Sequence, residues 1–119
     1  MGIKEVEGVS IISLGGDFIS EVDQVKLRTC VRELAGEGKI HALIDLTKVE
    51  HINSCGLGSI VCSLTTLRKA GGDLKLVGLG KFVKDLLRIT QLDMIFPVYP
   101  TLEKALKDMR AKKGSQKTN

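Results

Sequence analysis

Aromatic residues are scarce in this 119-residue chain, which has one Tyr, three Phe and no Trp. Aromatic side chains form the stacking surfaces of proteins that bind single-stranded nucleic acid, so their scarcity argues against that class. No hydrophobic run approaches the ~20 residues that cross a bilayer. The first residues, MGIKEVEG, lack the apolar core of a signal peptide. We therefore expect a cytoplasmic protein that binds no nucleic acid and does not insert into a membrane.

Cysteine is also rare, with only Cys30, Cys55 and Cys62. Their odd number and their spacing fit no metal site, so we expect no metal and no cofactor. Cys30 and Cys62 fall on the apolar stripes of expected helices, which predicts that both are buried thiols.

The net charge of +4 comes from one end of the chain. Residues 1–100 hold 12 basic and 12 acidic residues, whereas residues 101–119 hold six basic and two acidic residues. A short basic end is typical of a solvated terminus. We therefore expect one domain over residues 1–110 and a disordered basic tail over residues 111–119.

Hydrophobic periodicity predicts strands that alternate with helices. Helices are expected from Ser20 to Gly36, from about residue 56 to Gly71, over residues 82–89 and after a cap at Thr101. Strands are expected at residues 3–6, 9–14, 40–46, 74–79 and 95–99, the last at a sheet edge because Pro97 interrupts it. This order predicts an α/β fold with a mixed, mainly parallel sheet of four or five strands and helices packed on it.

The stretch HINSCGLGS, residues 51–59, follows the strand at 40–46. It therefore lies at the carboxyl ends of the strands, where functional loops gather in such sheets. Ser54 fits the N-cap of the next helix, a contribution of ~1 kcal/mol. Cys55 near a helix start fits a reactive thiol, but no general base is evident, so we expect no enzyme. The Gly-x-Gly pair lacks the lysine of a phosphate-binding loop.

Gly56 and Gly58 weaken the first turn of that helix by roughly 0.5–1 kcal/mol each. Their presence indicates that something approaches the backbone closely. A serine at a helix N-terminus is also a good place for a phosphate, because free amides and the helix dipole stabilise an anion there. At an interface, the added charge of about −2 would break the contact without unfolding the domain.

These features resemble the STAS domain of bacterial anti-sigma factor antagonists. The resemblance covers about residues 9–109, through VSIISLGGDF, HALIDLTKVEHINSCGLGSIV, RKAGGDLKLVGL and VKDLLRITQLDMIFPVYPTLEKAL. The family hallmark is a strand ending in Asp-Leu followed by Asp-Ser-(Ser/Thr)-Gly-Leu-Gly. Asp45-Leu46 and the segment from Asn53 to Gly58 match it, with Asn53 in place of the aspartate. A second family pattern, Gly-Glu-Leu-Asp, reads Gly16-Asp17-Phe18-Ile19, so Ile19 replaces its last acid.

The resemblance implies a regulator that binds an anti-sigma factor, itself a serine kinase, and is switched off when that kinase phosphorylates Ser54. It implies a monomer or weak homodimer. The expected partner-binding residues are Asp17, Phe18, Asn53, Ser54, Cys55, Gly56, Leu57 and Gly58. The alternative is a STAS subunit that docks on another partner, such as the ATPase of a lipid transporter, without phosphorylation.

Overall fold

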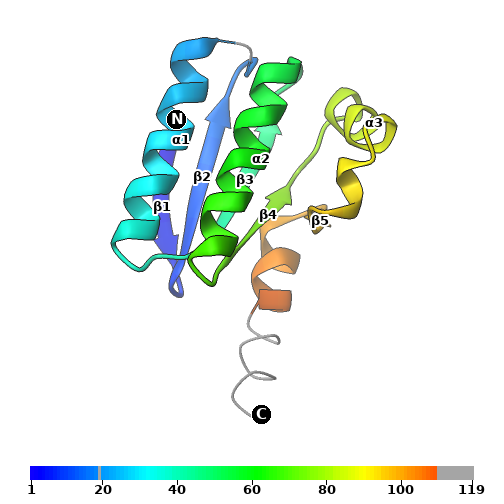
Figure 1. The fold of residues 1–119 in the computed structure, drawn as a ribbon. Helices are drawn as coiled ribbons and strands as arrows, with labels where there is room; N and C mark the ends of the chain where they lie inside the picture. Colours follow the sequence, from blue (N-terminus) through cyan, green and yellow to red (C-terminus); the bar gives the residue numbers. More distant parts are fainter. Residues whose placement is uncertain (19, 110–119) are drawn as a thin grey trace.

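The computed structural model describes residues 1–18 and 20–109, and Figure 1 shows how their elements are arranged. The strands are β1 (Gly2–Val6), β2 (Val9–Gly15), β3 (His41–Lys48), β4 (Asp73–Val77) and β5 (Val98–Tyr99). The helices are α1 (Glu21–Gly36), α2 (Ser54–Lys69), α3 (Lys81–Ile89) and the 3-10 turn η1 (Leu92–Met94), and residues 102–109 form a closing helix.

The five strands form one sheet in the order β1-β2-β3-β4-β5. β1 and β2 form an antiparallel hairpin, and the strands from β2 to β5 run parallel to one another. The α/β class and the mixed, mainly parallel sheet expected from the sequence are confirmed.

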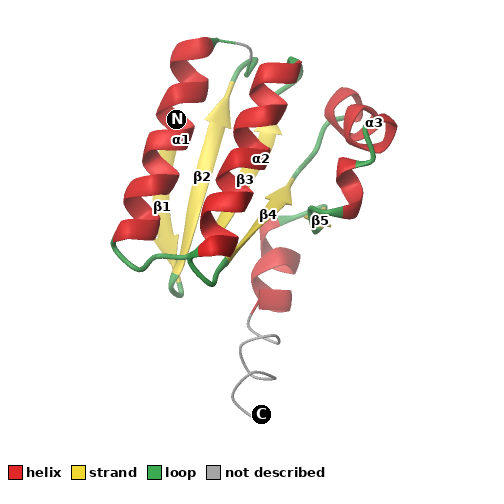
Figure 2. Ribbon diagram, viewed as in Figure 1, coloured by secondary structure: helices red, strands yellow, loops and turns green. Residues whose placement is uncertain are grey.

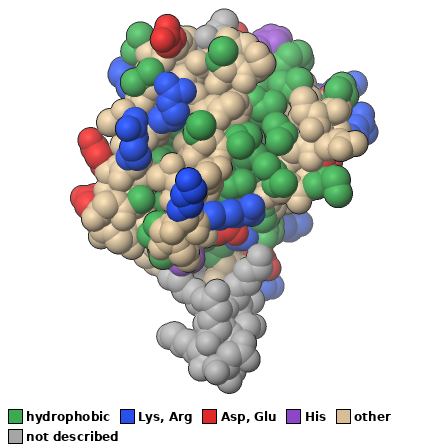
Figure 3. All heavy atoms as spheres, viewed as in Figure 1, with side chains coloured by type: hydrophobic (Ala, Val, Ile, Leu, Met, Phe, Trp, Pro, Cys, Tyr) green, Lys and Arg blue, Asp and Glu red, His purple; other side chains and the backbone are tan. Residues whose placement is uncertain are grey.

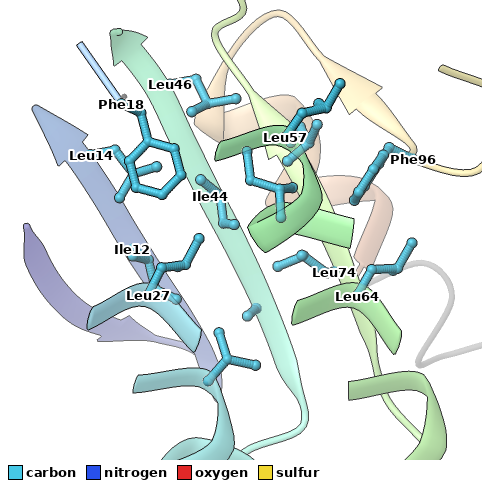
Figure 4. Packing of buried hydrophobic residues seen from close by; sticks show 14 of the residues in the cluster. Ile12, Leu14, Phe18, Leu27, Ile44, Leu46, Leu57, Leu64, Leu74 and Phe96 are labelled. Atoms are coloured by element: carbon cyan, nitrogen blue, oxygen red, sulfur yellow. The ribbon is translucent and has the colours of Figure 1, made fainter. Parts of the chain in front are cut away.

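The sheet is covered on both faces, because its central strands are apolar on both sides. α1 and α2 lie side by side over one face, and the closing helix lies at the other (Figure 2). Ile12, Ile44 and Leu76 belong to the larger hydrophobic cluster beneath α1 and α2, part of which Figure 4 shows. Their strand neighbours Ile11 and Leu43 belong to a smaller cluster with residues of the closing helix. Within the described residues, no helix is both long and apolar enough to cross a bilayer.

Two expectations were only partly right, and a third is confirmed. The last strand is at the sheet edge as predicted, but it shortens to Val98–Tyr99 because the backbone N–H groups of Ile95 and Phe96 donate to the carbonyl oxygen of Leu92 and continue the 3-10 turn. Cys30 is buried, whereas Cys62 is exposed because it lies on the outer face of α2. Thr101 caps the closing helix, its hydroxyl accepting from Lys104 N at 3.3 Å. Residue Ile19 and the tail at 111–119 lie outside the described residues.

Candidate functional site

Two loops at the carboxyl ends of β2 and β3 meet, as the sequence predicted. The backbone N–H of Phe18 donates to the carbonyl oxygen of His51 at 3.0 Å, and Phe18 forms an isolated parallel bridge with Ile52. The carboxylate of Asp17 accepts from the backbone N–H of His51 at 3.1 Å, and its oxygen lies 3.4 Å from Nδ1 of the same residue. The Asp17–Phe18 segment is therefore fixed beside the start of α2.

Asn53, and not Ser54, caps α2. Asn53 has extended backbone angles (φ −97°, ψ 177°), and its Oδ1 accepts from the backbone N–H of Gly56 at 2.8 Å. The expectation that Ser54 is the N-cap is therefore wrong, because the asparagine one position earlier already fills that role. Ser54 is instead the first residue of the 16-residue helix, and it is exposed.

Polar side chains of α1 fix this cap from the side. Nε2 of Gln24, a residue only 4% exposed, donates to Oδ1 of Asn53 at 3.0 Å. One turn later, Arg28 donates to the hydroxyl of Ser59 at 3.1 Å, and that hydroxyl donates to the carbonyl oxygen of Cys55 at 3.1 Å. Sequence reasoning missed Gln24 and Arg28. Their spacing of four residues could have identified them, because it places two long polar side chains on one face of a helix.

The two glycines of α2 stand in different surroundings. A Cβ on Gly56 would lie 2.5 Å from the carbonyl oxygen of Phe18 and 2.8 Å from Cγ1 of Ile52. The chain itself therefore makes the close approach expected at this glycine. A Cβ on Gly58 would have no atom within 4 Å. Nothing within the described fold requires a glycine at position 58.

The eight residues expected to bind a partner divide by exposure. Asp17, Asn53, Ser54, Cys55 and Gly58 are exposed, and they lie on the same edge of the sheet. The others, Phe18, Gly56 and Leu57, are buried, Phe18 and Leu57 in the main core. A partner would thus touch the five exposed residues, while the three buried residues hold them in place. The binding role of the whole set stays a prediction.

The chemistry available at this site is that of an exposed hydroxyl at a helix start. The first amides of an α-helix have no partner within the helix, and the dipole favours negative charge there. The arrangement can therefore stabilise a phosphate carried by Ser54. Among the described residues, no group of three or more His, Cys, Asp or Glu side chains is placed to hold a metal ion.

Comparison with known proteins identifies the family. The STAS domain family model matches residues 1–105, so the chain belongs to the STAS domain family. One relative is the TM1081 homolog of Thermotoga neapolitana, and its name assigns it provisionally to the anti-sigma factor antagonists. It is 31% identical over 109 residues, which cover 92% of this chain and 96% of the relative.

Solved structures agree with that assignment. The crystal structure of TM1081 from Thermotoga maritima superposes with a TM-score of 0.85 at 27% identity, covering 92% of this chain and 93% of that one. An anti-sigma factor antagonist from Mycobacterium paratuberculosis superposes with a TM-score of 0.78 at 30% identity, covering 91% of each chain. The protein is thus a STAS domain similar to proteins named as anti-sigma factor antagonists, as its motifs suggested.

Proposed function

We propose that this protein is an anti-sigma factor antagonist that binds an anti-sigma factor through the exposed edge around Ser54. The anti-sigma factor is a serine kinase in this proposal. Binding removes it from its sigma factor, and its transfer of a phosphate to Ser54 ends the binding. The names of the relatives support the first part of the proposal, and the surroundings of Ser54 support the second.

The observation that carries the proposal is the placement of Ser54. Its side chain is exposed at the first position of α2, while the residues around it are held by the Asn53 cap and by the Asp17–His51 contacts. A kinase can reach such a hydroxyl without unfolding the domain. The phosphate, in turn, would sit at the positive end of the helix dipole, an interaction typically worth ~0.3–1 kcal/mol.

Phosphorylation would act on the interface and leave the fold intact. A phosphate brings a charge of about −2 into an interface that binds the neutral serine. The cost of removing water from this charge and its repulsion by the partner would both weaken binding. A loss of ~3 kcal/mol would weaken binding by more than a hundredfold. We therefore expect Ser54→Asp to bind weakly, and Ser54→Ala to bind as tightly as the wild type and to resist inactivation.

The direct test uses each purified anti-sigma factor kinase encoded in the genome from which the chain comes. Binding to the wild type, Ser54→Ala and Ser54→Asp is measured by calorimetry, and phosphate is located by mass spectrometry after incubation with ATP. Thr29→Asp is the matched control. Thr29 is exposed on α1, and its substitution adds the same charge outside the loop around Ser54. This control should bind as the wild type does.

Asn53 gives the second candidate function its specific support. No carboxylate stands beside Ser54 at position 53, so the group that the family places there is missing. A chain that gains no phosphate on Ser54, and whose Ser54→Asp variant binds as tightly as the wild type, would be a STAS subunit that docks without phosphorylation. A lipid-transporter ATPase would then be the partner class to test.

A further inference from the structure

A cavity of about 770 Å³ opens at the carboxyl ends of β4 and β5. One wall is the flank of α3 that carries Lys84, Leu87 and Arg88, and the other is formed by Asp93 and residues 96–100, which lead into and out of β5. Sites for small molecules have roughly 300–1,000 Å³ and, in parallel sheets, lie outside the carboxyl ends of strands. The size and the place of this cavity therefore fit a small-molecule site.

The cavity lies on a different flank of α3 from the hydrophobic patch that faces α2. Figure 3 shows hydrophobic side chains gathered over the region between α2 and α3. Helical spacing places Phe82 and Ile89 on the flank of α3 opposite to Lys84 and Arg88, which line the cavity. The loop around Ser54 also contributes no residue to the cavity. The cavity is therefore a separate feature of the molecule, away from the candidate phosphorylation site.

Apolar side chains form much of the cavity surface. Leu87 and Phe96 line it and are buried in the main core. Leu79 and Pro97 are half-buried in its walls, and Val98 is 38% exposed. A ligand with an apolar body can cover Leu79, Pro97 and Val98 and remove their surface from water, which favours binding.

The charged side chains at the cavity leave one positive and one negative group for a ligand. Lys84 of α3 and Asp93 of η1 are both exposed, and neither takes part in an ion pair within the described residues. Arg88 and Asp85 also line the cavity, but they pair with each other at 3.3 Å. The four charges of the cavity sum to zero, so a ligand with no net charge complements them.

We propose that this cavity binds a zwitterionic small molecule whose apolar body carries one carboxylate and one ammonium group, as an apolar amino acid or dipeptide does. The carboxylate lies at Lys84 and the ammonium group at Asp93, because hydrogen bonds between charged groups are the stronger ones. The apolar body covers Leu79, Pro97 and Val98. This inference goes beyond the proposed function and does not depend on it, because Ser54 is not at the cavity.

Simpler ligands fit the charges of the cavity less well. A plain carboxylate is attracted by Lys84 but repelled by Asp93, and the reverse holds for a plain amine. An uncharged apolar molecule removes water from both charged groups without replacing their hydrogen bonds, which costs free energy. A zwitterion satisfies both groups at once, so it is the ligand class that this cavity selects.

Three probes with the same phenyl group test which charges the cavity recognises. L-Phenylalanine has both charged groups, 3-phenylpropanoate lacks the ammonium group, and 2-phenylethylamine lacks the carboxylate. Each is titrated into the isotope-labelled chain and followed by NMR, as is the dipeptide phenylalanyl-leucine with its N-acetyl and C-amide forms. We expect a zwitterion to shift the signals of Gly78, Lys84 and Val98, which line the cavity. Its single-charge analogues should bind with a Kd about fivefold higher, the effect of losing one exposed ion pair.

Two variants assign each charge of the ligand to its partner. Lys84→Gln should weaken binding of the zwitterion about fivefold without weakening 2-phenylethylamine, and Asp93→Asn should do so without weakening 3-phenylpropanoate. Lys26→Gln and Asp23→Asn are the matched controls, because they remove the same charges from exposed positions on α1, outside the cavity. Both controls should leave every Kd within about twofold, as surface substitutions usually do.

The titrations also define the results that overturn the inference. No shifts at the cavity with either zwitterion at about 10 mM, enough to detect a Kd of ~1 mM, would show that it binds no such molecule. Equal Kd values for the three phenyl probes would show an apolar hollow that recognises neither charge. Tighter binding of a single-charge probe than of phenylalanine would assign the cavity to an anion or an amine instead. All these measurements use the chain alone, so their failure is distinct from a failure to bind an anti-sigma factor.

Discussion

The two glycines of α2 allow one matched experiment to test both the fold of the site and its proposed function. Gly58 is exposed, and an alanine Cβ there would meet no atom within 4 Å. Alanine is better than glycine inside a helix by roughly 0.5–1 kcal/mol. We therefore expect Gly58→Ala to raise the free energy of unfolding by that amount, which for a domain of this size raises the Tm by about 2–5 °C.

Gly56→Ala should have the opposite effect, although it makes the same chemical change two residues earlier. The new Cβ would lie 2.5 Å from the carbonyl oxygen of Phe18, a backbone atom that no rotamer change can move away. Overpacking of this kind costs about 1–3 kcal/mol, which exceeds the gain in helix propensity. The expected result is a net loss of roughly 1–2 kcal/mol and a loosened contact between Phe18 and the start of α2.

Urea unfolding followed by far-UV circular dichroism measures both variants against the wild type. Equal stability of the two variants would refute the close contact between Phe18 and Gly56. Binding supplies the second readout: Gly58→Ala should be more stable, yet should bind the anti-sigma factor at least about tenfold more weakly, a change of ~1.4 kcal/mol. A stabilised Gly58→Ala that binds like the wild type would refute the idea that a partner approaches α2 closely at this position.

Three further outcomes are expected. Asn53→Ala should lose ~1 kcal/mol of stability with the cap, whereas Asn53→Asp should keep the cap and gain ~0.3–1 kcal/mol from the dipole in thermal unfolding. Burial, helped by the hydrogen bond to Asp108, raises the pKa of Tyr99 from 10.0 to about 12. The protonated phenol therefore favours the folded state, and urea unfolding should show stability falling between pH ~10 and ~12, with a smaller fall in Tyr99→Phe. Cys55→Ser should keep its affinity for the anti-sigma factor within about tenfold, and complete loss would reveal a chemical role for the thiol.

The sheet and the meeting of the two loops could be predicted because several signals agree. The apolar run at residues 40–46 has the length of a strand, and its residues do pack on both faces of the sheet, as Leu43 and Ile44 show. Parallel strands bring their carboxyl ends to one edge, so the Asp17 loop and the Ser54 loop had to be neighbours. Neither prediction depended on which side chains the site itself carries.

The start of α2 and its outer face could not be predicted, because the residue types are ambiguous there. Asn53 and Ser54 are equally good caps by type, and only the reach of Oδ1 to the N–H of Gly56 decides between them. Cys62 counts as apolar in any periodicity, yet it points outward. In α3, two apolar stripes lie side by side, and the pattern cannot tell which of them the core receives.

Two hydrogen bonds to Asn53 show whether the fold needs an amide at this position or would also accept the aspartate of the family. Gln24 and the N–H of Gly56 both donate to the same oxygen of Asn53, and an aspartate would accept both bonds equally well. Neither bond therefore requires an amide at position 53. The exchange of aspartate for asparagine instead removes one negative charge beside Ser54. A kinase that acts on Ser54 thereby loses a group that could orient the hydroxyl. Asn53→Asp should accordingly speed phosphorylation of Ser54, which can be measured with the kinase that binds the wild type.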